Sequence, residues 1–397
     1  MTLLYLRTSP AFLKALLALS VVFVMLATTG WTAVRPHNPL SDPRTASLAA
    51  WTAGRIGARK LPDPTAAPRA IARFFASLTG AQRTLLADRY PLVVGNLNGA
   101  PPTLRYLANR RALAEARATE DTLSRSGKLT PLGRENAAEL VERYDSLLSD
   151  HRQILAFDPS GTGRAAEVLG DLATATRVAI IVPGVDTDML RFERDDKTYS
   201  APVGMAHELY GAEHAAEPDA HTAVIAWADY TTPAGVGLDA STGKLAERGA
   251  VRLEALLSAL PQHSDVALFC HSYGSVLCGE AAPDLTHGQV SDITVFGSPG
   301  MRVEHAADLH TTANLWAARD SGDWIGDVPH MEFAGLGHGA DPVSESFGAR
   351  VISAAGASGH PNYFAPDTTS LANFAEIALG EYAGVACNHG DACRAGL

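Results

Sequence analysis

The chain of 397 residues is poor in charged residues, which make up 19% of it, and it has only five lysines among its 32 basic residues. With 46% hydrophobic residues it is too apolar and too weakly charged for a disordered protein. It also lacks an excess of positive charge, because the formal net charge is −11. Residues 1–60 carry +6, so the remainder carries −17. Proteins that bind nucleic acid need a basic surface for the phosphates, so the composition argues against a nucleic-acid partner.

One segment lacks charge altogether. Residues 15–34 run for 20 positions without a charged side chain, after Arg7 and Lys14. A helix of this length spans a hydrocarbon core of ~30 Å, and the preceding basic residues place the bulk of the chain outside. A cleaved signal peptide is the alternative, although Thr28-Thr29-Gly30 is a poor cleavage site. We therefore expect residues 1–35 to be an anchor or signal segment, with the body outside the cell membrane or secreted.

Cysteine is scarce, and the four present fall into two pairs. Cys387 and Cys393 lie close together in the tail CNHGDAC, and in an oxidising compartment we expect them to form a disulfide. A metal site from the same cysteines with His389 and Asp391 is the alternative, but the spacing suits few structural zinc sites. Cys270 and Cys278 are expected to be buried free thiols.

The first part of the body has no strand pattern. Residues 36–64 are rich in Pro, Ala, Thr and Arg without a clear period, which predicts a linker. Residues 65–153 carry apolar side chains at helical spacing, with Asp63 or Thr65 as a candidate start cap and Pro131 early in a later helix. We expect a helical region that packs on the following domain.

From residue 154 to residue 397 the pattern is that of an α/β domain. Short apolar runs rich in β-branched residues alternate with helical stretches; the runs are ILAFD, VAIIVPG, TAVIAWADY, DVALFCHS, DITVFGS and ANLWAAR. Continuous apolar runs of this length are typical of strands buried on both faces, and their alternation with helices predicts a mostly parallel sheet covered on both sides. Sites in such sheets form at the carboxyl ends of the strands.

One of these strands ends in a candidate nucleophile. DVALF is followed by Cys270-His271-Ser272-Tyr273-Gly274 and then by a helical run, which places a serine at a sharp turn between strand and helix. Such a turn needs small residues two before and two after the serine, and Gly274 fits this better than Cys270 does. The turn would expose the Ser272 hydroxyl above the helix N-terminus. The alternative is a serine that only caps the helix.

A serine hydroxyl needs a base, and in this kind of fold the acid and then the histidine follow the serine along the chain. The strand ANLWAAR is followed by Asp320 and Asp323; we favour Asp323 and keep Asp320 as the second candidate. His360, in SGHPNYF, is the expected base, and His338 in a glycine-rich loop is its rival. Trp324, next to Asp323, is either part of an apolar rim over the site or a core residue.

An acyl-transfer site also needs donors for an oxyanion. The backbone N–H of Tyr273, directly after the serine, supplies one. The second is expected from Val185 in VAIIVPGV, where Gly184 lets the backbone approach closely. The alternative is an ordinary strand-to-helix turn that requires glycine.

These motifs together resemble a known family. The segments IIVPGVDTDM, CHSYGS, FGSPG, GADP, FGARV and GHPNY, with the upstream PLVVGNLNGAPPTLRYLANRRAL, are similar to an actinobacterial alpha/beta-hydrolase family long catalogued as a domain of unknown function. The resemblance covers about residues 66–382. It implies an alpha/beta-hydrolase fold with Ser272 as nucleophile, Asp323 as acid and His360 as base. This sequence departs from the family in having Cys270 where glycine is usual.

The sequence therefore predicts an exported, membrane-anchored serine hydrolase that acts on a small-molecule or lipid-like ester without metal or organic cofactor. A peptidase or amidase would use the same triad. A surface binding module that kept the fold without catalysis is an alternative of another class. The presence of Ser272, Asp323 and His360 together favours the enzyme, because a protein that no longer catalyses the reaction would be expected to have lost at least one of them.

Overall fold

The computed structural model describes residues 42–285 and 289–397. Its centre is a sheet of eight strands in the order β12-β9-β8-β7-β5-β6-β4-β3. These strands are β3 (Gln153–Asp158), β4 (Arg164–Gly170), β5 (Arg177–Val182), β6 (Thr222–Ala228), β7 (Asp265–His271), β8 (Val290–Phe296), β9 (Asn314–Ala318) and β12 (Arg350–Val351). The six strands from β6 to β12 are parallel to one another, and β4 and β3 add antiparallel pairs at one edge.

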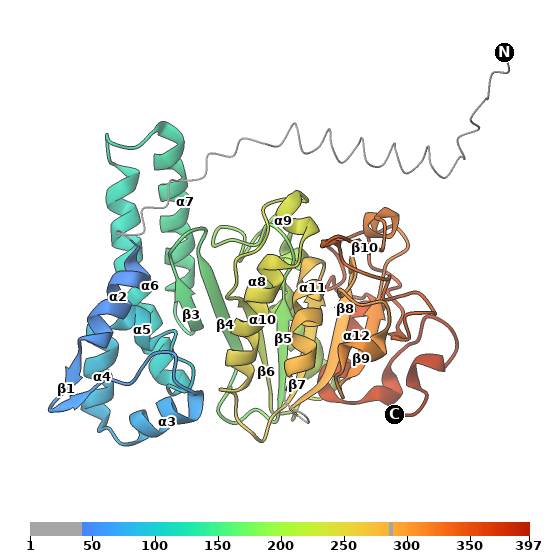
Figure 1. The fold of residues 1–397 in the computed structure, drawn as a ribbon, viewed down its shortest axis with the longest axis horizontal. Helices are drawn as coiled ribbons and strands as arrows, with labels where there is room; N and C mark the ends of the chain where they lie inside the picture. The colour runs from blue at the N-terminus through green and yellow to red at the C-terminus, as the bar shows by residue number, and fades with distance from the viewer. Residues whose placement is uncertain (1–41, 286–288) are drawn as a thin grey trace, which may run out of the picture.

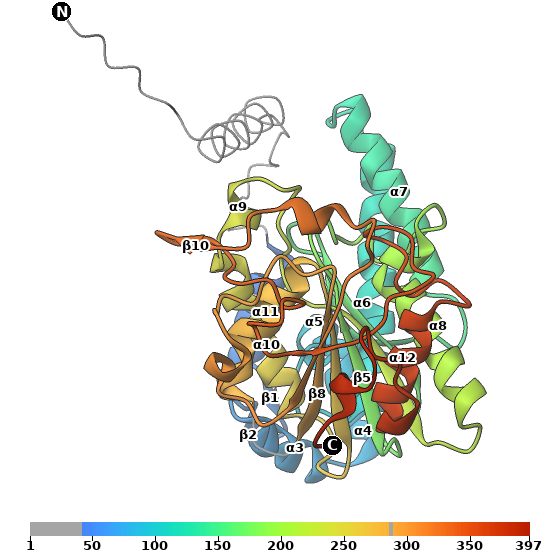
Figure 2. The same cartoon turned by 90° about the vertical axis from the view of Figure 1, so that its right-hand side faces the viewer.

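Helices cover both faces of the sheet (Figures 1 and 2). One face carries α10 (Lys244–Leu257) and α11 (Tyr273–Ala281), and the other carries α8 (Pro202–Ala216) and α12 (Thr369–Leu379). Strand β5 shows why its run is continuously apolar: Val178 and Ile180 belong to the core on the α10 side, and Ala179 and Ile181 to the core on the α8 side. Every second residue thus faces the same layer. The predicted mostly parallel sheet with helices on both faces is confirmed.

The chain order creates a crevice at one end of the sheet. Strand β5 lies between β6 on one side and β7 on the other, and the later strands β8 and β9 continue beyond β7. The connections that leave β5 and β7 therefore diverge to opposite sides. In open α/β sheets ligands bind at such a reversal, outside the carboxyl ends of the strands.

The helical region stands beside the antiparallel edge (Figure 1). It contains α3 (Pro68–Ala76), α4 (Gly80–Arg89), α5 (Pro91–Val94), α6 (Pro102–Ser124) and α7 (Pro131–Leu147). Helix α6 packs on β3. Leu113 belongs to the core on the α8 side of the sheet, and the Asn109 amide donates to Ile154 O at 2.8 Å. Asp63 does not cap a helix, because its carboxylate accepts from Thr65 and α3 begins only at Pro68.

The prediction of a linker over residues 36–64 is wrong for the part that the structure describes. Residues 42–64 form helix α2 (Pro43–Thr52) and a hairpin of β1 (Arg55–Ile56) and β2 (Arg59–Lys60). Trp51 is fully buried with its ring 5.5 Å from that of Tyr90, and its indole N–H donates to Pro62 O. A single large aromatic residue therefore anchors a segment whose composition suggested no structure.

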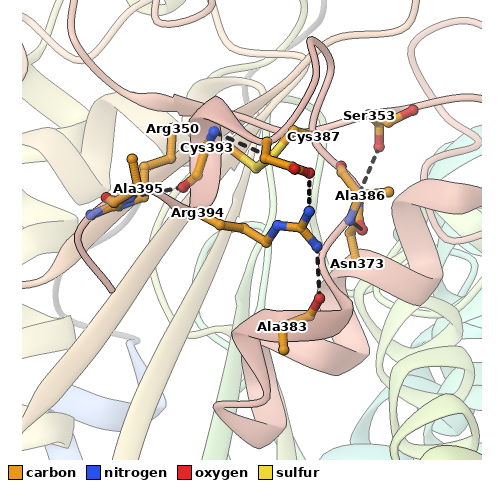
Figure 3. Close-up of a disulfide and its surroundings, with 10 residues drawn as sticks. Arg350, Ser353, Asn373, Ala383, Ala386, Cys387, Cys393, Arg394 and Ala395 are labelled. Atoms are coloured by element: carbon orange, nitrogen blue, oxygen red, sulfur yellow. Dashed lines mark hydrogen bonds and ion pairs between the residues drawn. A yellow bond between two sulfur atoms is a disulfide. The ribbon is translucent and has the colours of Figure 1, made fainter.

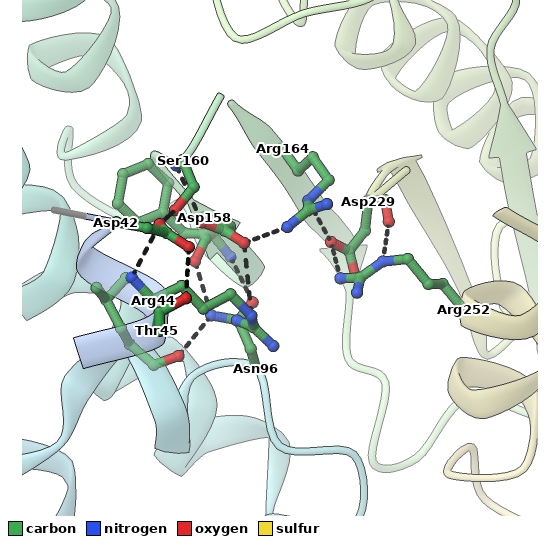
Figure 4. Close-up of polar contacts among 11 residues, drawn as sticks. Asp42, Arg44, Thr45, Asn96, Asp158, Ser160, Arg164, Asp229 and Arg252 are labelled. Carbon is green, nitrogen blue, oxygen red and sulfur yellow. Dashed lines mark hydrogen bonds and ion pairs between the residues drawn. The ribbon is translucent and has the colours of Figure 1, made fainter. Parts of the chain in front are cut away.

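Ion pairs join this segment to the sheet (Figure 4). Asp158 at the end of β3 is fully buried between Arg44 of α2 and Arg164 of β4. Asp229, just after β6, pairs with Arg252 of α10 at 2.5 Å. The Asp158 carboxylate is desolvated by burial, but the two arginines outweigh this and lower its pKa. A buried carboxylate held by two guanidinium groups ties α2 to the domain.

The remaining elements are short. A four-residue helix α9 (Leu238–Ser241) and a hairpin of β10 (Glu332–Phe333) and β11 (Leu336–Gly337) lie in loops above the sheet. The tail is closed by a disulfide between Cys387 and Cys393, the pair predicted from the sequence (Figure 3). Arg350 of β12 donates to Cys393 O and Ala395 O, both at 2.8 Å, so the tail is also bonded to the sheet edge.

No helix within the described ranges 42–285 and 289–397 is long and apolar enough to cross a membrane. The predicted anchor or signal at residues 15–34 lies outside these ranges.

Candidate active site

Ser272 lies at the tip of the turn between β7 and α11. Its backbone has φ 53° and ψ −123°, a strained conformation for a residue other than glycine. The turn is tight enough that a Cβ at Gly274 would lie 2.3 Å from Val182 O, and therefore glycine is required there. The Ser272 N–H donates to Phe296 O at 3.1 Å. These contacts fix the serine at the carboxyl end of β7.

Cys270 and Cys278 are not free thiols, and that prediction is wrong. They form a disulfide that links the end of β7 to the second turn of α11, with 6.5 Å between the Cα atoms. The sharp turn at Ser272 brings the two segments together, and this proximity is not visible in the spacing alone. Cys270 stands where glycine is usual in such turns, and here it takes part in a covalent link across the turn.

His360 and Asp323 form a close pair. The His360 imidazole Nδ1 lies 2.9 Å from Oδ1 and 3.0 Å from Oδ2 of Asp323. Asp323 also accepts from the Ile325 N–H at 3.0 Å and from the Tyr363 hydroxyl at 2.6 Å. Burial raises the pKa of the Asp323 carboxyl, but these hydrogen bonds outweigh burial, and the pKa lies below its usual value. Asp323 is therefore an ionised group in position to orient the imidazole.

Asp320 is placed differently. Its carboxylate accepts from the N–H groups of Gly322 and Gly359, each at 2.9 Å, and its own N–H donates to the Tyr363 hydroxyl. Asp320 thus holds the backbone next to His360 rather than the imidazole. Tyr363, which the sequence reading did not single out, connects the two acids. The order along the chain, GHPNY, could have drawn attention to it, because it lies three residues after His360.

Two further residues shape the histidine's position. A Cβ at Gly297, directly after β8, would lie 3.1 Å from His360 and 3.0 Å from the Asp323 carboxylate, so glycine there makes room for the pair. The His271 ring lies against that of His360 with the centroids 4.7 Å apart and the planes tilted by 40°, and its Nε2 lies 3.0 Å from His360 O. Burial lowers the pKa of His271 to about 3, so at neutral pH it is uncharged and donates this hydrogen bond from Nε2–H.

The serine and the histidine line one cleft. It has a volume of about 260 Å³, and its walls include the two residues together with Gly184, Val185 and Trp324. A Cβ at Gly184 would lie 2.6 Å from Ser272 Cβ, so the loop after β5 contacts the serine. Trp324 is 47% exposed, with its ring 5.0 Å from that of His360. It is part of the rim and not a core residue.

The two predicted oxyanion donors flank the serine. Tyr273 follows it at the start of α11, and its hydroxyl donates to Thr242 O at 2.7 Å. Val185 lies in the loop that contacts Ser272. That loop is held by the next residue, Asp186, whose N–H donates to Pro233 O and whose carboxylate accepts from the Gly235 N–H, both at 2.8 Å.

His338, the rival base, lies elsewhere. It is buried, its Nε2 is 2.7 Å from Ala240 O, and its ring packs edge-on against Tyr273. Burial lowers its pKa. The structure brings Ser272, His360 and Val185 to one cleft, with Asp323 bonded to His360 and Tyr273 next to the serine. His338 does not line this cleft and lies against Ala240 and the Tyr273 ring instead. Within the described ranges no cluster of His, Cys, Asp or Glu is arranged to hold a metal ion, including the tail around Cys387 and Cys393.

Comparisons with known proteins support the fold. Residues 158–333 match the model of a family described as alpha/beta hydrolase, a range that includes Ser272 and Asp323 and stops before His360. With the order of the sheet, this match shows an alpha/beta-hydrolase fold.

The relatives among curated proteins are mycobacterial. An uncharacterized protein of Mycobacterium tuberculosis is 28% identical over 84% of this chain, and an uncharacterized protein of Mycobacterium bovis is 30% identical over 41% of it. The alignments cover 57% and 58% of those proteins. The chain thus spans little more than half the length of the curated relatives it matches.

Solved structures of hydrolases resemble the chain weakly. An α/β serine hydrolase without a lid from Xanthomonas campestris has 13% identity and a TM-score of 0.34, with 59% of this chain and 96% of that chain covered. A 2,6-dihydroxy-pseudo-oxynicotine hydrolase has 10% identity and a TM-score of 0.34, with 79% of this chain and 95% of that chain covered.

Proposed function

We propose that the chain is a serine hydrolase that cleaves carboxylic esters through an acyl-enzyme intermediate. One observation carries the proposal: a serine in a strained turn at the end of a central strand shares a cleft with a histidine whose other ring nitrogen is bonded to a buried carboxylate. This is the set of groups that activates a serine hydroxyl. The match to an alpha/beta-hydrolase family supports it.

The geometry suggests the following steps. His360 Nε2 takes the proton of the Ser272 hydroxyl as its oxygen attacks the ester carbonyl, and Asp323 stabilises the imidazolium that forms. The N–H groups of Val185 and Tyr273 bind the oxyanion, at roughly 3–4 kcal/mol for each donor in comparable sites. The imidazolium then gives its proton to the leaving alcohol. Water attacks the acyl-serine with the same proton transfers, releasing the acid and restoring the serine.

The proposed location is outside the cytoplasm, with residues 15–34 as a membrane anchor. Both disulfides support export, because such bonds persist in oxidising compartments and are rare in the cytosol. The uncharged run after Arg7 and Lys14 supports retention at the membrane.

The test is labelling of the full chain by a fluorophosphonate and hydrolysis of p-nitrophenyl esters of increasing chain length. Ser272→Ala removes the acyl acceptor, so we expect loss of labelling and of hydrolysis by several orders of magnitude with the fold retained. Ser200→Ala is the matched control, since Ser200 lines the same cleft and its hydroxyl bonds only the backbone at Lys197 O. Labelling that survives in Ser272→Ala, or that is absent from the folded wild type, contradicts the proposal.

A further inference from the structure

A second cleft lies between the helical region and the α/β domain. Its volume is about 560 Å³, within the range of ~300–1,000 Å³ of small-molecule sites. Its walls come from α3 and α4, from residues 99–101 with the first turn of α6, from Leu155 of β3, and from the segments that precede β5 and β7. These last segments place it at the amino ends of the strands, whereas Ser272 lies at the carboxyl ends, about 20 Å away along the strands. The two clefts share no lining residue.

The lining has an unusual charge pattern. Three arginines line the cleft, Arg69, Arg83 and Arg105, and no aspartate or glutamate does, although acidic residues outnumber basic ones in the chain, 43 to 32. None of the three forms an ion pair with any residue in the described ranges. Arg69 donates to Gln262 Oε1 at 3.4 Å, and Arg83 donates to Phe75 O at 2.8 Å. The cleft therefore carries positive charge without a counter-charge in its walls.

Arg105 is the central residue of this pattern. It is 5% exposed; its Nε donates to Gly95 O and its Nη1 to Asn98 Oδ1, both at 3.1 Å. Both acceptors are neutral. Burial lowers the pKa of Arg105 to about 10 against a weaker attraction from Asp229, so the guanidinium is still protonated at neutral pH. Asp229 is itself ion-paired with Arg252 and forms no ion pair with Arg105. An unpaired buried cation is costly, and it is rare for arginine to be buried without a partner. An anion in the cleft would supply the missing charge.

The rest of the lining is apolar. Leu155, Leu172, Leu256 and Leu260 form the buried part of the wall, and Ala72 and Ala76 of α3 contribute from the helix side. Apart from the arginines, only Ser258 and Gln262 offer polar side chains. A ligand rich in hydrogen-bonding groups would leave most of them unpaired here, whereas an alkyl chain would gain from contact with the leucines.

We propose that this cleft binds an anionic amphiphile, with an acyl or alkyl chain along the leucine wall and a carboxylate or phosphate head against Arg105. The planar guanidinium matches either head group. The site stands apart from the hydrolase reaction, and its binding does not require Ser272.

The test is equilibrium dialysis of radiolabelled decanoate against the full chain in lipid nanodiscs. Decyl phosphate and 1-decanol are competitors, and acetate tests the head alone. We expect one decanoate per chain, displacement by decyl phosphate at similar or lower concentration, and at least tenfold weaker competition by 1-decanol. The relative strength of decanoate and decyl phosphate decides between a carboxylate and a phosphate head. Competition by 1-decanol as strong as that by decanoate would overturn the role of the arginine.

Variants place the ligand in the cleft. Ala72→Trp fills it from an exposed position on α3, and Ala138→Trp on the exposed face of α7 is the matched control. We expect at least tenfold weaker binding of decanoate for the first and a change within twofold for the second, and equal binding by both contradicts the site.

Arg105→Gln removes the charge and should weaken decanoate binding tenfold or more and abolish the preference for decanoate over 1-decanol. If Arg105→Gln does not fold, the pair at residues 72 and 138 still decides. Ser272→Ala should bind as the wild type does, which separates this proposal from the hydrolase.

Discussion

At the scale of single residues, the roles of the two aspartates can be separated. Asp323 contacts the imidazole of His360, while Asp320 binds backbone N–H groups at Gly322 and Gly359. The sequence favours Asp323 over Asp320, and the physical difference between them lies in where the chain turns after β9.

Asp323→Asn should lower kcat by several orders of magnitude with little change in KM, because an amide does not stabilise the imidazolium or fix its tautomer. Asp320→Asn is the matched control. It should cost about 1 kcal/mol of stability, as lost caps do, with kcat changed less than tenfold. Steady-state kinetics and urea unfolding of both variants give the measurement. A folded Asp320→Asn that loses kcat to the same extent would move the acid to Asp320.

Glu213 of α8 gives a pH-dependent prediction at the same scale. It is 1% exposed, and burial raises the pKa of its carboxyl from 4.5 to about 7. The folded state therefore binds the proton more tightly than the unfolded one, so the stability that this residue contributes is complete below pH 4.5 and is lost as the pH rises to 7. Glu213→Gln stays neutral throughout. Relative to it, the wild type should lose roughly 3 kcal/mol between pH 4.5 and 7 in urea unfolding. A constant difference over that range contradicts the shift.

At the scale of elements, the sequence predicts the strands that are buried on both faces. All six apolar runs named from the sequence coincide with β3, β5, β6, β7, β8 and β9. Strand β4 was missed because Glu167 interrupts its run. That residue is buried only because Arg152, which precedes β3, pairs with it. Tertiary pairing of this kind leaves no local signal.

The residues of the candidate site divide in the same way, into those that the sequence predicts and those that depend on tertiary contacts. The serine, acid and oxyanion loop could be named because each follows a recognisable strand. His360 could be named because it comes after the acid along the chain and just before the last helical segment. His271, Gly297 and Tyr363 act through contacts with His360 and Asp323 that only the folded structure reveals, although the motif GHPNY places Tyr363 near His360 in the sequence. The disulfide Cys270–Cys278 was missed because it depends on how sharply the chain reverses at Ser272.

This disulfide offers a prediction with an internal control. Replacing both Cys270 and Cys278 by alanine should cost about 2–3 kcal/mol, since the bond closes a short loop. Replacing Cys387 and Cys393 should cost a similar amount, because that loop is of similar length. Only the first pair spans the turn that holds Ser272, so only its loss should lower kcat at a temperature where both variants are folded. Equal kcat in the two variants would show that the link serves stability alone.

At the scale of the whole molecule, the chain combines an acidic body with a basic, partly apolar N-terminal segment. The body carries two disulfides and no unpaired cysteine. A reducing compartment would not maintain these bonds, and the 20-residue uncharged run would be costly to leave in water. The charge distribution and the bonds thus support the arrangement that we propose, with residues 15–34 as a membrane anchor and the body outside the cytoplasm.

The expected outcome is that the protein sediments with membranes, retains residues near its N-terminus by terminal sequencing, and shows no thiol reactive toward maleimide until it is denatured and reduced. Val22→Arg tests the span directly. A charge at the centre of a membrane helix costs about 2.5–3.5 kcal/mol, so this variant should weaken membrane association, whereas Val34→Arg at the end of the run should not. Mature protein in the culture medium that begins near residue 30 would identify the segment as a cleaved signal. Labelling of all four cysteines in the native protein would instead place the body in a reducing compartment.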